Sequence, residues 1–195
     1  MTFSGHVPGT REYRRLIIGL FFAGIATFAQ LYSAQAVLPL ISVDLEVSPA
    51  TAAITVSAAT LGLAVAVIPW SSVADRIGRV PAMAIGVLAA TALGLLAPLS
   101  DGIVLFLTLR FAEGLALGAV PAVALAYLSE EVEPRHAAAA AGSYIAGTTV
   151  GGLLGRIVSG TVGEVAGWRA GVWAVAAVCA GAAVLFLWLT PRARG

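Results

Sequence analysis

Charged residues are scarce in this chain of 195 amino acids: they make up 11% of it, while hydrophobic residues make up 59%. A typical water-soluble domain is about 25% charged and about 45–50% apolar. The composition therefore excludes both a water-soluble protein and a disordered one. Lysine is absent, so all 11 basic residues are arginine. The formal net charge of +1 is uninformative about function. We expect no nucleic-acid partner.

Cysteine and histidine are almost missing as well. The one cysteine, Cys179, lies in an apolar run, which excludes a disulfide framework and a cysteine-based metal site. The two histidines, His6 and His136, lie outside the long apolar runs, and no aspartate lies inside one. An intramembrane protease would need a Ser–His or a paired-Asp arrangement there, and no P-loop, His-Glu-x-x-His or dinucleotide-binding pattern occurs. We therefore expect no enzyme, no metal and no other cofactor.

Long apolar runs dominate what is present. A helix needs about 20 apolar residues to cross a bilayer, and the polar connections between the runs are short, so consecutive helices should pack antiparallel as neighbours. We predict an all-α membrane protein in which a six-helix transmembrane bundle, residues 16–190, lies between two tails, residues 1–15 and 191–195. The predicted spans are 16–40, 52–70, 81–98, 103–128, 137–162 and 170–189.

The placement of arginine predicts the orientation in the membrane. Eight arginines fall at one end of the predicted bundle, and only Arg169 falls at the other, among acidic residues. Because cytoplasmic loops carry the excess of basic residues, both termini should lie in the cytoplasm, as an even number of spans of the cell membrane requires. The eight are Arg11, Arg14, Arg15, Arg76, Arg79, Arg135, Arg192 and Arg194.

A stretch around the second connection has a counterpart 89 positions later in the chain. Residues 16–98 and 103–190 would then be two copies of one three-helix unit. Three crossings are an odd number, so the second copy enters the membrane from the opposite face, an inverted repeat that is frequent in secondary transporters. The alternative is a chance match between two glycine-containing connections. The matching pairs are Gly62 with Gly151, Val73 with Val162, Asp75 with Glu164, and Gly78 with Gly167.

Three motifs carry a resemblance to a known family. The stretch SSVADRIGR at 71–79 is similar to the Gly-x-Leu/Val-Ala-Asp-Arg-x-Gly-Arg loop between helices 2 and 3 of the major facilitator superfamily. RFAEG at 110–114 resembles that family's Arg-x-x-Gln-Gly pattern of helix 4, and GTTVGG at 147–152 resembles the Gly-Pro-x-x-Gly-Gly of its proton-driven exporters. Glutamate replaces the glutamine of the second motif, and threonine the proline of the third.

The resemblance implies the N-terminal half of a transporter of the drug or metabolite efflux type, because members of the family have two six-helix halves. It implies proton-coupled alternating access, with the lipid bilayer, a small-molecule substrate and a second six-helix half as partners. That half would be the rest of a longer transporter or a second copy of this chain. By the same resemblance, Asp75, Arg76, Gly78 and Arg79 form a cytoplasmic gating loop that latches onto the second half.

Three charged residues fall inside predicted spans. Arg110 and Glu113 are three residues apart on one helix face, where they can partly neutralise each other. A charge at bilayer depth costs on the order of 2.5–3.5 kcal/mol, so the pair is either a structural ion pair or a proton or substrate site. Arg156 has two alternative partners, Glu113 or the acidic residues at 44 and 46. Two buried arginines would suit an anionic or carboxylate substrate group.

Uncharged residues complete the list of candidates. Gln30 and Tyr32 lie in the first span and either line the substrate pathway or form hydrogen bonds between helices. Span 137–162 carries a stripe of small residues at four-residue intervals, which allows close helix approach in lipid. The stripe either packs within this bundle or faces the second half as a hinge. The glycines of the stripe are Gly147, Gly151 and Gly155, and Gly152 is a further helix-packing or hinge candidate.

Two functions other than that of half a transporter remain open from the residues alone. The first alternative is a six-helix protein that transports nothing and binds a partner membrane protein. The second alternative is a half-sized carrier that works as a homodimer.

Overall fold

The computed structural model describes residues 5–190, and within that range the regular elements are all helical. Six units in it are long and apolar enough to cross a membrane, and they follow the predicted spans in order. The predicted all-α six-span fold is therefore confirmed, while the tail at 191–195 lies outside the described residues. The helices are α1 (Arg11–Leu31), α2 (Leu38–Asp44), α3 (Pro49–Ile77), α4 (Arg79–Leu96), α5 (Ile103–Leu117), α6 (Ala119–Glu131), α7 (Ala137–Ala166) and α8 (Trp168–Leu189).

The helices run past the predicted spans at the ends of the bundle. The segments 71–80 and 163–169, expected to be loops, are helical as far as Ile77 and Ala166. At the start of the chain, helix α1 begins at Arg11, inside the predicted tail, where the side chain of Thr10 accepts a hydrogen bond from the N–H of Tyr13. The length of an apolar run reflects the thickness of the hydrocarbon core of the bilayer. The helix itself can extend beyond that core into water, as long as its backbone hydrogen bonds are satisfied.

Single glycines make the two turns that follow these long helices. Gly78 and Gly167 have φ angles of 95° and 85°, a region that side chains rarely adopt. Each donates its N–H over 2.9 Å to the carbonyl four residues earlier, in Ala74 and in Gly163. The two turns thus have the same geometry 89 positions apart.

The inverted repeat extends to the helix crossings. Helix α3 crosses α5 at Gly62, where an added Cβ would lie 2.9 Å from the backbone nitrogen of Leu115. Helix α7 crosses α1 at Gly151, where an added Cβ would lie 2.8 Å from the Cα of Ile25. Both glycines thus permit a close backbone approach at corresponding positions of the two units, as the repeat predicted from sequence requires.

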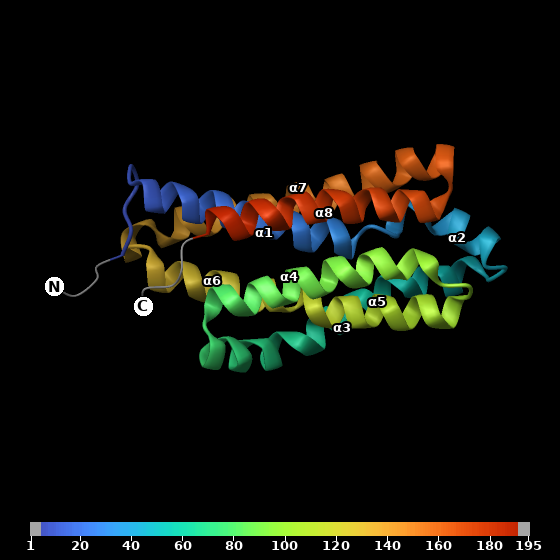
Figure 1. Cartoon of the computed structure of the whole chain (residues 1–195), viewed down its shortest axis with the longest axis horizontal. Helices are drawn as coiled ribbons and strands as arrows, with labels where there is room; N and C mark the ends of the chain where they lie inside the picture. Colours follow the sequence, from blue (N-terminus) through green and yellow to red (C-terminus); the bar gives the residue numbers. More distant parts are fainter. Residues whose placement is uncertain (1–4, 191–195) are drawn as a thin grey trace.

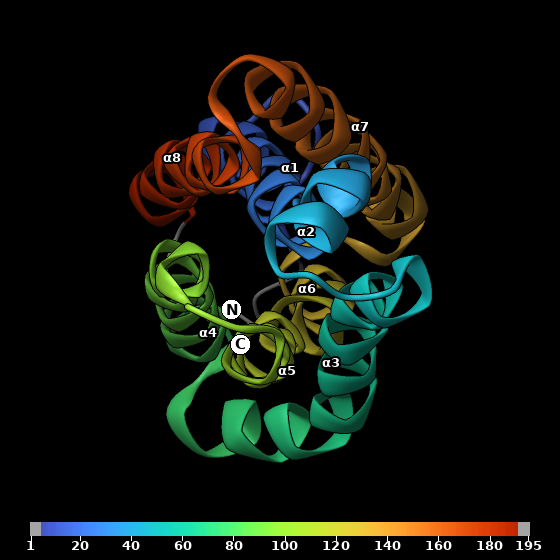
Figure 2. The ribbon, with the colours of Figure 1, turned by 90° about the vertical axis from the view of Figure 1, so that its right-hand side faces the viewer.

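The two repeats interleave rather than stand side by side. Helices α1, α7 and α8 pack together on one side of the bundle, and α3, α4, α5 and α6 pack on the other (Figure 1). Each group therefore combines the first helix of one repeat with the last two helices of the other. The end-on view places α1 and α5 between the outer helices of their groups (Figure 2). Each of these two helices is thus flanked on both sides by long helices of its own group.

Candidate functional site

The first helix of each repeat is interrupted inside the membrane-spanning part. Helix α1 ends at Leu31, and the chain passes through a 3-10 turn before α2 begins at Leu38. Helix α5 ends at Leu117, and in α6 the ring of Pro121 has no N–H to donate back to the Leu117 carbonyl. Each of these segments remains one membrane span, as predicted, but the apolar runs gave no sign of the interruptions. Interrupted helices in corresponding positions of inverted repeats typically form the binding site of a transporter.

Arg110 of α5 binds the end of α1 at its interruption. Its Nη2 donates to the carbonyl of Leu31 over 2.7 Å, and its Nη1 donates to the carbonyl of Gln30 over 3.2 Å. The same Nη1 lies 3.3 Å from the hydroxyl of Ser33, a residue that the sequence analysis missed. The guanidinium thereby satisfies the Leu31 carbonyl, which has no partner within a helix that stops there, and is an additional donor to the Gln30 carbonyl, which also accepts from the N–H of Ser33.

Glu113 completes this cluster, as its spacing from Arg110 predicted. One carboxylate oxygen accepts a hydrogen bond from Arg110 Nη1, and both side chains are fully buried. Gly94 of α4 makes room for the cluster, because an added Cβ would lie 2.7 Å from Gln30 Cδ and 3.0 Å from Glu113 Oε1. Arginine keeps its proton in proteins, so the Glu113 carboxyl is the group in this cluster that can gain or lose one.

Arg156 lies in a separate cluster and meets neither of the partners expected for it. Its Nε donates to Gln35 Oε1 over 2.7 Å, its Nη1 donates to the carbonyl of Gly152 over 3.0 Å, and its guanidinium carbon lies 4.2 Å from the ring centroid of Tyr32. The interruption of α1 brings Tyr32 and Gln35 to this position beside α7. The candidates in the first span are thus divided, Gln30 toward Arg110 and Tyr32 toward Arg156.

Asp44, one of the acidic residues expected as an alternative partner of Arg156, is held elsewhere. Asp44 at the end of α2 accepts a hydrogen bond from Trp168 Nε1 over 2.9 Å and forms an ion pair with Arg169. Arg169 also donates to the backbone carbonyls of Pro98 and Ser100, over 3.0 and 3.2 Å. This group ties the ends of α2 and α8 to the turn after α4.

Charged residues at the other end of the bundle form a network around Arg79. Its Nη1 donates to Asp75 over 2.6 Å, and its Nη2 donates to Glu130 at the end of α6 over 2.8 Å. Glu130 was not among the predicted residues. Gly78 makes the turn between Asp75 and Arg79, and Arg76 is exposed. The network leaves the Asp75 side chain 61% exposed.

The glycine stripe of α7 faces α1. Added Cβ atoms at Gly147 and Gly155 would lie 2.9 and 3.0 Å from backbone carbons of Phe21 and Ala29. At Gly152, an added Cβ would lie 3.4 Å from Cδ2 of the Tyr32 ring. These glycines therefore bring two helices of this bundle together. In this conformation α1 covers the stripe, as expected for packing within this bundle.

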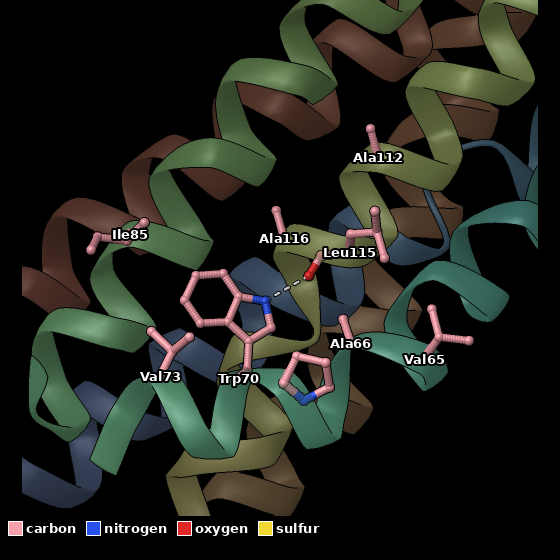
Figure 3. Close-up of a pocket in the computed structure, with 9 residues that line it drawn as sticks. Val65, Ala66, Trp70, Val73, Ile85, Ala112, Leu115 and Ala116 are labelled. Carbon is pink, nitrogen blue, oxygen red and sulfur yellow. Dashed lines mark hydrogen bonds between the residues drawn. The ribbon is translucent and has the colours of Figure 1, made fainter. Parts of the chain in front are cut away.

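An apolar cavity of about 520 Å³, which no sequence pattern indicated, lies between α3, α4 and α5. The indole of Trp70 lies across it and donates from Nε1 to the carbonyl of Leu115 over 2.7 Å, just before α5 ends (Figure 3). The other side chains that line the cavity are Val65, Ala66, Pro69, Val73, Ile85, Ala112 and Ala116.

Comparisons with known proteins agree with this architecture. The family model described as Major Facilitator Superfamily matches residues 20–195. The chain is 36% identical over 186 residues to the inner membrane transport protein YnfM of Escherichia coli and, at the same identity, to the uncharacterized MFS-type transporter YybF of Bacillus subtilis. Both matches cover 95% of this chain but 45% and 46% of the relative, so the chain spans about half the length of the curated relatives it matches.

Two solved structures have the same fold. The proton:xylose symporter XylE superposes with a TM-score of 0.79 at 15% identity, over 93% of this chain and 45% of that one. A bacterial homologue of the human lysosomal transporter Spinster, in an inward-facing and unoccupied conformation, gives a TM-score of 0.64 at 21% identity, over 97% of this chain and 45% of that one.

A multidrug resistance protein, MdtL of Escherichia fergusonii, is also similar in sequence, at 31% identity over 150 residues.

Proposed function

Because the chain belongs to the major facilitator superfamily, we propose that it is the N-terminal half of a proton-coupled exporter. In this proposal a small molecule crosses the cell membrane by alternating access between this six-helix half and a second one, with both termini in the cytoplasm. The similarity to a protein named for multidrug resistance supports efflux. The second half is the remainder of a longer transporter, as in relatives about twice as long.

The observation that carries the proposal is the contact of Arg110 with both Glu113 and the end of α1. A charged Glu113 competes with the α1 carbonyls for the N–H groups of the guanidinium. When Glu113 takes up a proton, the competing charge disappears and Arg110 binds the α1 carbonyls more strongly. Proton binding is thereby linked to the position of α1 at its interruption, which is the link that coupled transport requires.

The network around Arg79 has the role of a cytoplasmic latch in this proposal. Asp75 keeps most of its carboxylate exposed while Arg79 holds it at the end of α3. An exposed carboxylate can bind the N-terminus of a helix of the second half, an interaction worth about 0.3–1 kcal/mol. A contact of that size can be released and remade as the two halves rock.

A chimera tests the proposal. In it, this chain replaces the segment of the Escherichia coli relative that it matches, so that the second half is present. The chimera is reconstituted in vesicles loaded with a pH-sensitive dye, an imposed pH gradient drives transport, and three probes are supplied: ethidium, benzoate and xylose. We expect proton movement that depends on at least one probe and is lost in Glu113→Gln.

The matched control is Glu164→Gln, which removes an exposed carboxylate at the end of α7. It should leave the proton movement unchanged. Probe-dependent proton movement that persists in Glu113→Gln would show that Glu113 is a structural ion-pair partner. No probe-dependent movement of protons or probes in a folded chimera would contradict proton-coupled transport of these three classes of solute.

A further inference from the structure

Arg156 differs from the other arginine inside the spans because it has no acidic partner in the described part of the chain. The ion pairs there join other basic residues to the carboxylates, and none includes Arg156. Its hydrogen-bond acceptors, the Gln35 amide and the Gly152 carbonyl, are uncharged. These groups and the Tyr32 ring fix the guanidinium but do not neutralise its positive charge.

The guanidinium of Arg156 is fixed and still has donors to offer. Gln35 and Gly152 take up one N–H of Nε and one of Nη1, which leaves three of the five N–H groups without a partner among residues 5–190. Arg156 is half-buried and Gln35 is exposed, so these donors can be reached from outside the bundle. A planar guanidinium held in this way matches the two oxygens of a carboxylate.

Arg110 cannot serve the same purpose in this conformation. It is fully buried, and its Nη1 and Nη2 are engaged by Glu113 and by the end of α1. Of the two arginines inside the spans, Arg156 is therefore the one with a charge that an incoming ligand can reach.

The depth of Arg156 favours a solute over a lipid headgroup. It lies ten residues, or about 15 Å, from the outer end of the 30-residue helix α7. A helix of that length is roughly 45 Å long and extends beyond the hydrocarbon core of about 30 Å at both ends. When the helix is centred on the bilayer, Arg156 then lies below the level of the lipid phosphates.

We propose that Arg156, oriented by Tyr32 and Gln35, binds the carboxylate of a small organic acid, and that the transported solute is an organic anion. This inference rests on the proposed transport function and names its substrate class. The carboxylate supplies the negative charge that the described residues do not. Tyr32 and Gln35 act as positioning residues, since they touch the guanidinium and hold its free edge outward.

The test uses the 195-residue chain with ¹⁵N-labelled arginine in phosphatidylcholine nanodiscs, with benzoate as the probe and benzamide as its uncharged analogue. The Arg156 Nε–H resonance, assigned from Arg156→Lys, should shift saturably with benzoate and not with benzamide, while the Arg110 resonance stays in place. Calorimetry should show binding weakened at least about tenfold in Arg156→Gln. Circular dichroism shows whether the variants are folded, and Arg156→Lys, which retains the charge, should bind with intermediate affinity.

Three outcomes would overturn this proposal. One is equal binding of benzamide, and another is unchanged benzoate affinity in Arg156→Gln. The third is a shift seen only when phosphatidylglycerol is added to the nanodiscs, which would identify a lipid headgroup as the ligand. The chimera should keep the benzoate affinity; its loss there would show that the second half covers Arg156 and would overturn the proposal as well. None of these measurements uses proton flux, so failure here is distinguishable from failure of the proposed function.

Discussion

Two glycines of helix α7 should respond in opposite directions to the same substitution. At Gly147, an added Cβ would collide first with the backbone carbonyl oxygen of Phe21, and it would lie 2.9 Å from two backbone carbons of the same residue, about 0.5 Å inside the ordinary contact distance of 3.4 Å. Backbone atoms cannot rotate away, so α1 and α7 must separate. At Gly142, nothing lies within 4 Å of the added Cβ. The comparison therefore isolates the close approach of the two helices.

The expected magnitude follows from two terms. Alanine in place of glycine favours a helix by roughly 0.5–1 kcal/mol at either position, so this gain cancels when the two variants are compared. Overpacking a tight contact costs about 1–3 kcal/mol, and it applies at Gly147 alone. Gly147→Ala should therefore be less stable than Gly142→Ala by about 1–3 kcal/mol.

The assay is equilibrium unfolding of the purified chain in mixed micelles with increasing SDS, followed by tryptophan fluorescence. Gly142→Ala should unfold at the same or a higher SDS fraction than the parent chain, and Gly147→Ala at a lower one. Equal stability of the two variants would refute the close contact between α1 and α7 on which this reasoning depends.

Three further predictions concern contacts inside the bundle and contacts at the ends of its helices. Arg110→Met should lower the free energy of unfolding by about 3–5 kcal/mol because it leaves a buried carboxylate unpaired, and adding Glu113→Leu should recover part of that loss in a double-mutant cycle of SDS unfolding. Trp70→Phe, which removes the hydrogen bond to the Leu115 carbonyl, should cost about 0.5–1.5 kcal/mol in the same assay; no change would mean that this bond is absent in the membrane. Arg169→Gln should speed amide hydrogen exchange at the ends of α2 and α8 and leave the middle of the bundle unchanged, whereas uniform acceleration would contradict a local role.

The parts of the fold that follow from local chemistry could be predicted from the sequence. Six apolar runs specify six spans because each must cover the hydrocarbon core with apolar side chains. The 89-residue correspondence between Gly78 and Gly167 identified the inverted repeat, because a turn with positive φ needs glycine in both copies. The spacing of Arg110 and Glu113 likewise predicted their ion pair, since residues three apart share a helix face.

The parts that were missed depend on residues far apart in the chain. The interruption of α1 is stabilised by Arg110, about 80 positions away, and no local signal in the first span reports that partner. Arg156 is likewise oriented by Gln35, 121 positions away. Helix α7 presents a small-residue face by its own periodicity, but which helix covers that face depends on how the two repeats interleave.

The sequence by itself determined that this protein is an all-α membrane protein with six spans in two inverted units, because bilayer thickness and backbone hydrogen bonding act on each span separately. Only the tertiary structure decided how the polar groups inside those spans are shared. It enclosed Arg110 with Glu113 against the end of α1 and left Arg156 accessible beside Tyr32. The physical reason is that a buried charge must find its partners on the helices that pack beside it. Which helices those are depends on the packing of the whole bundle.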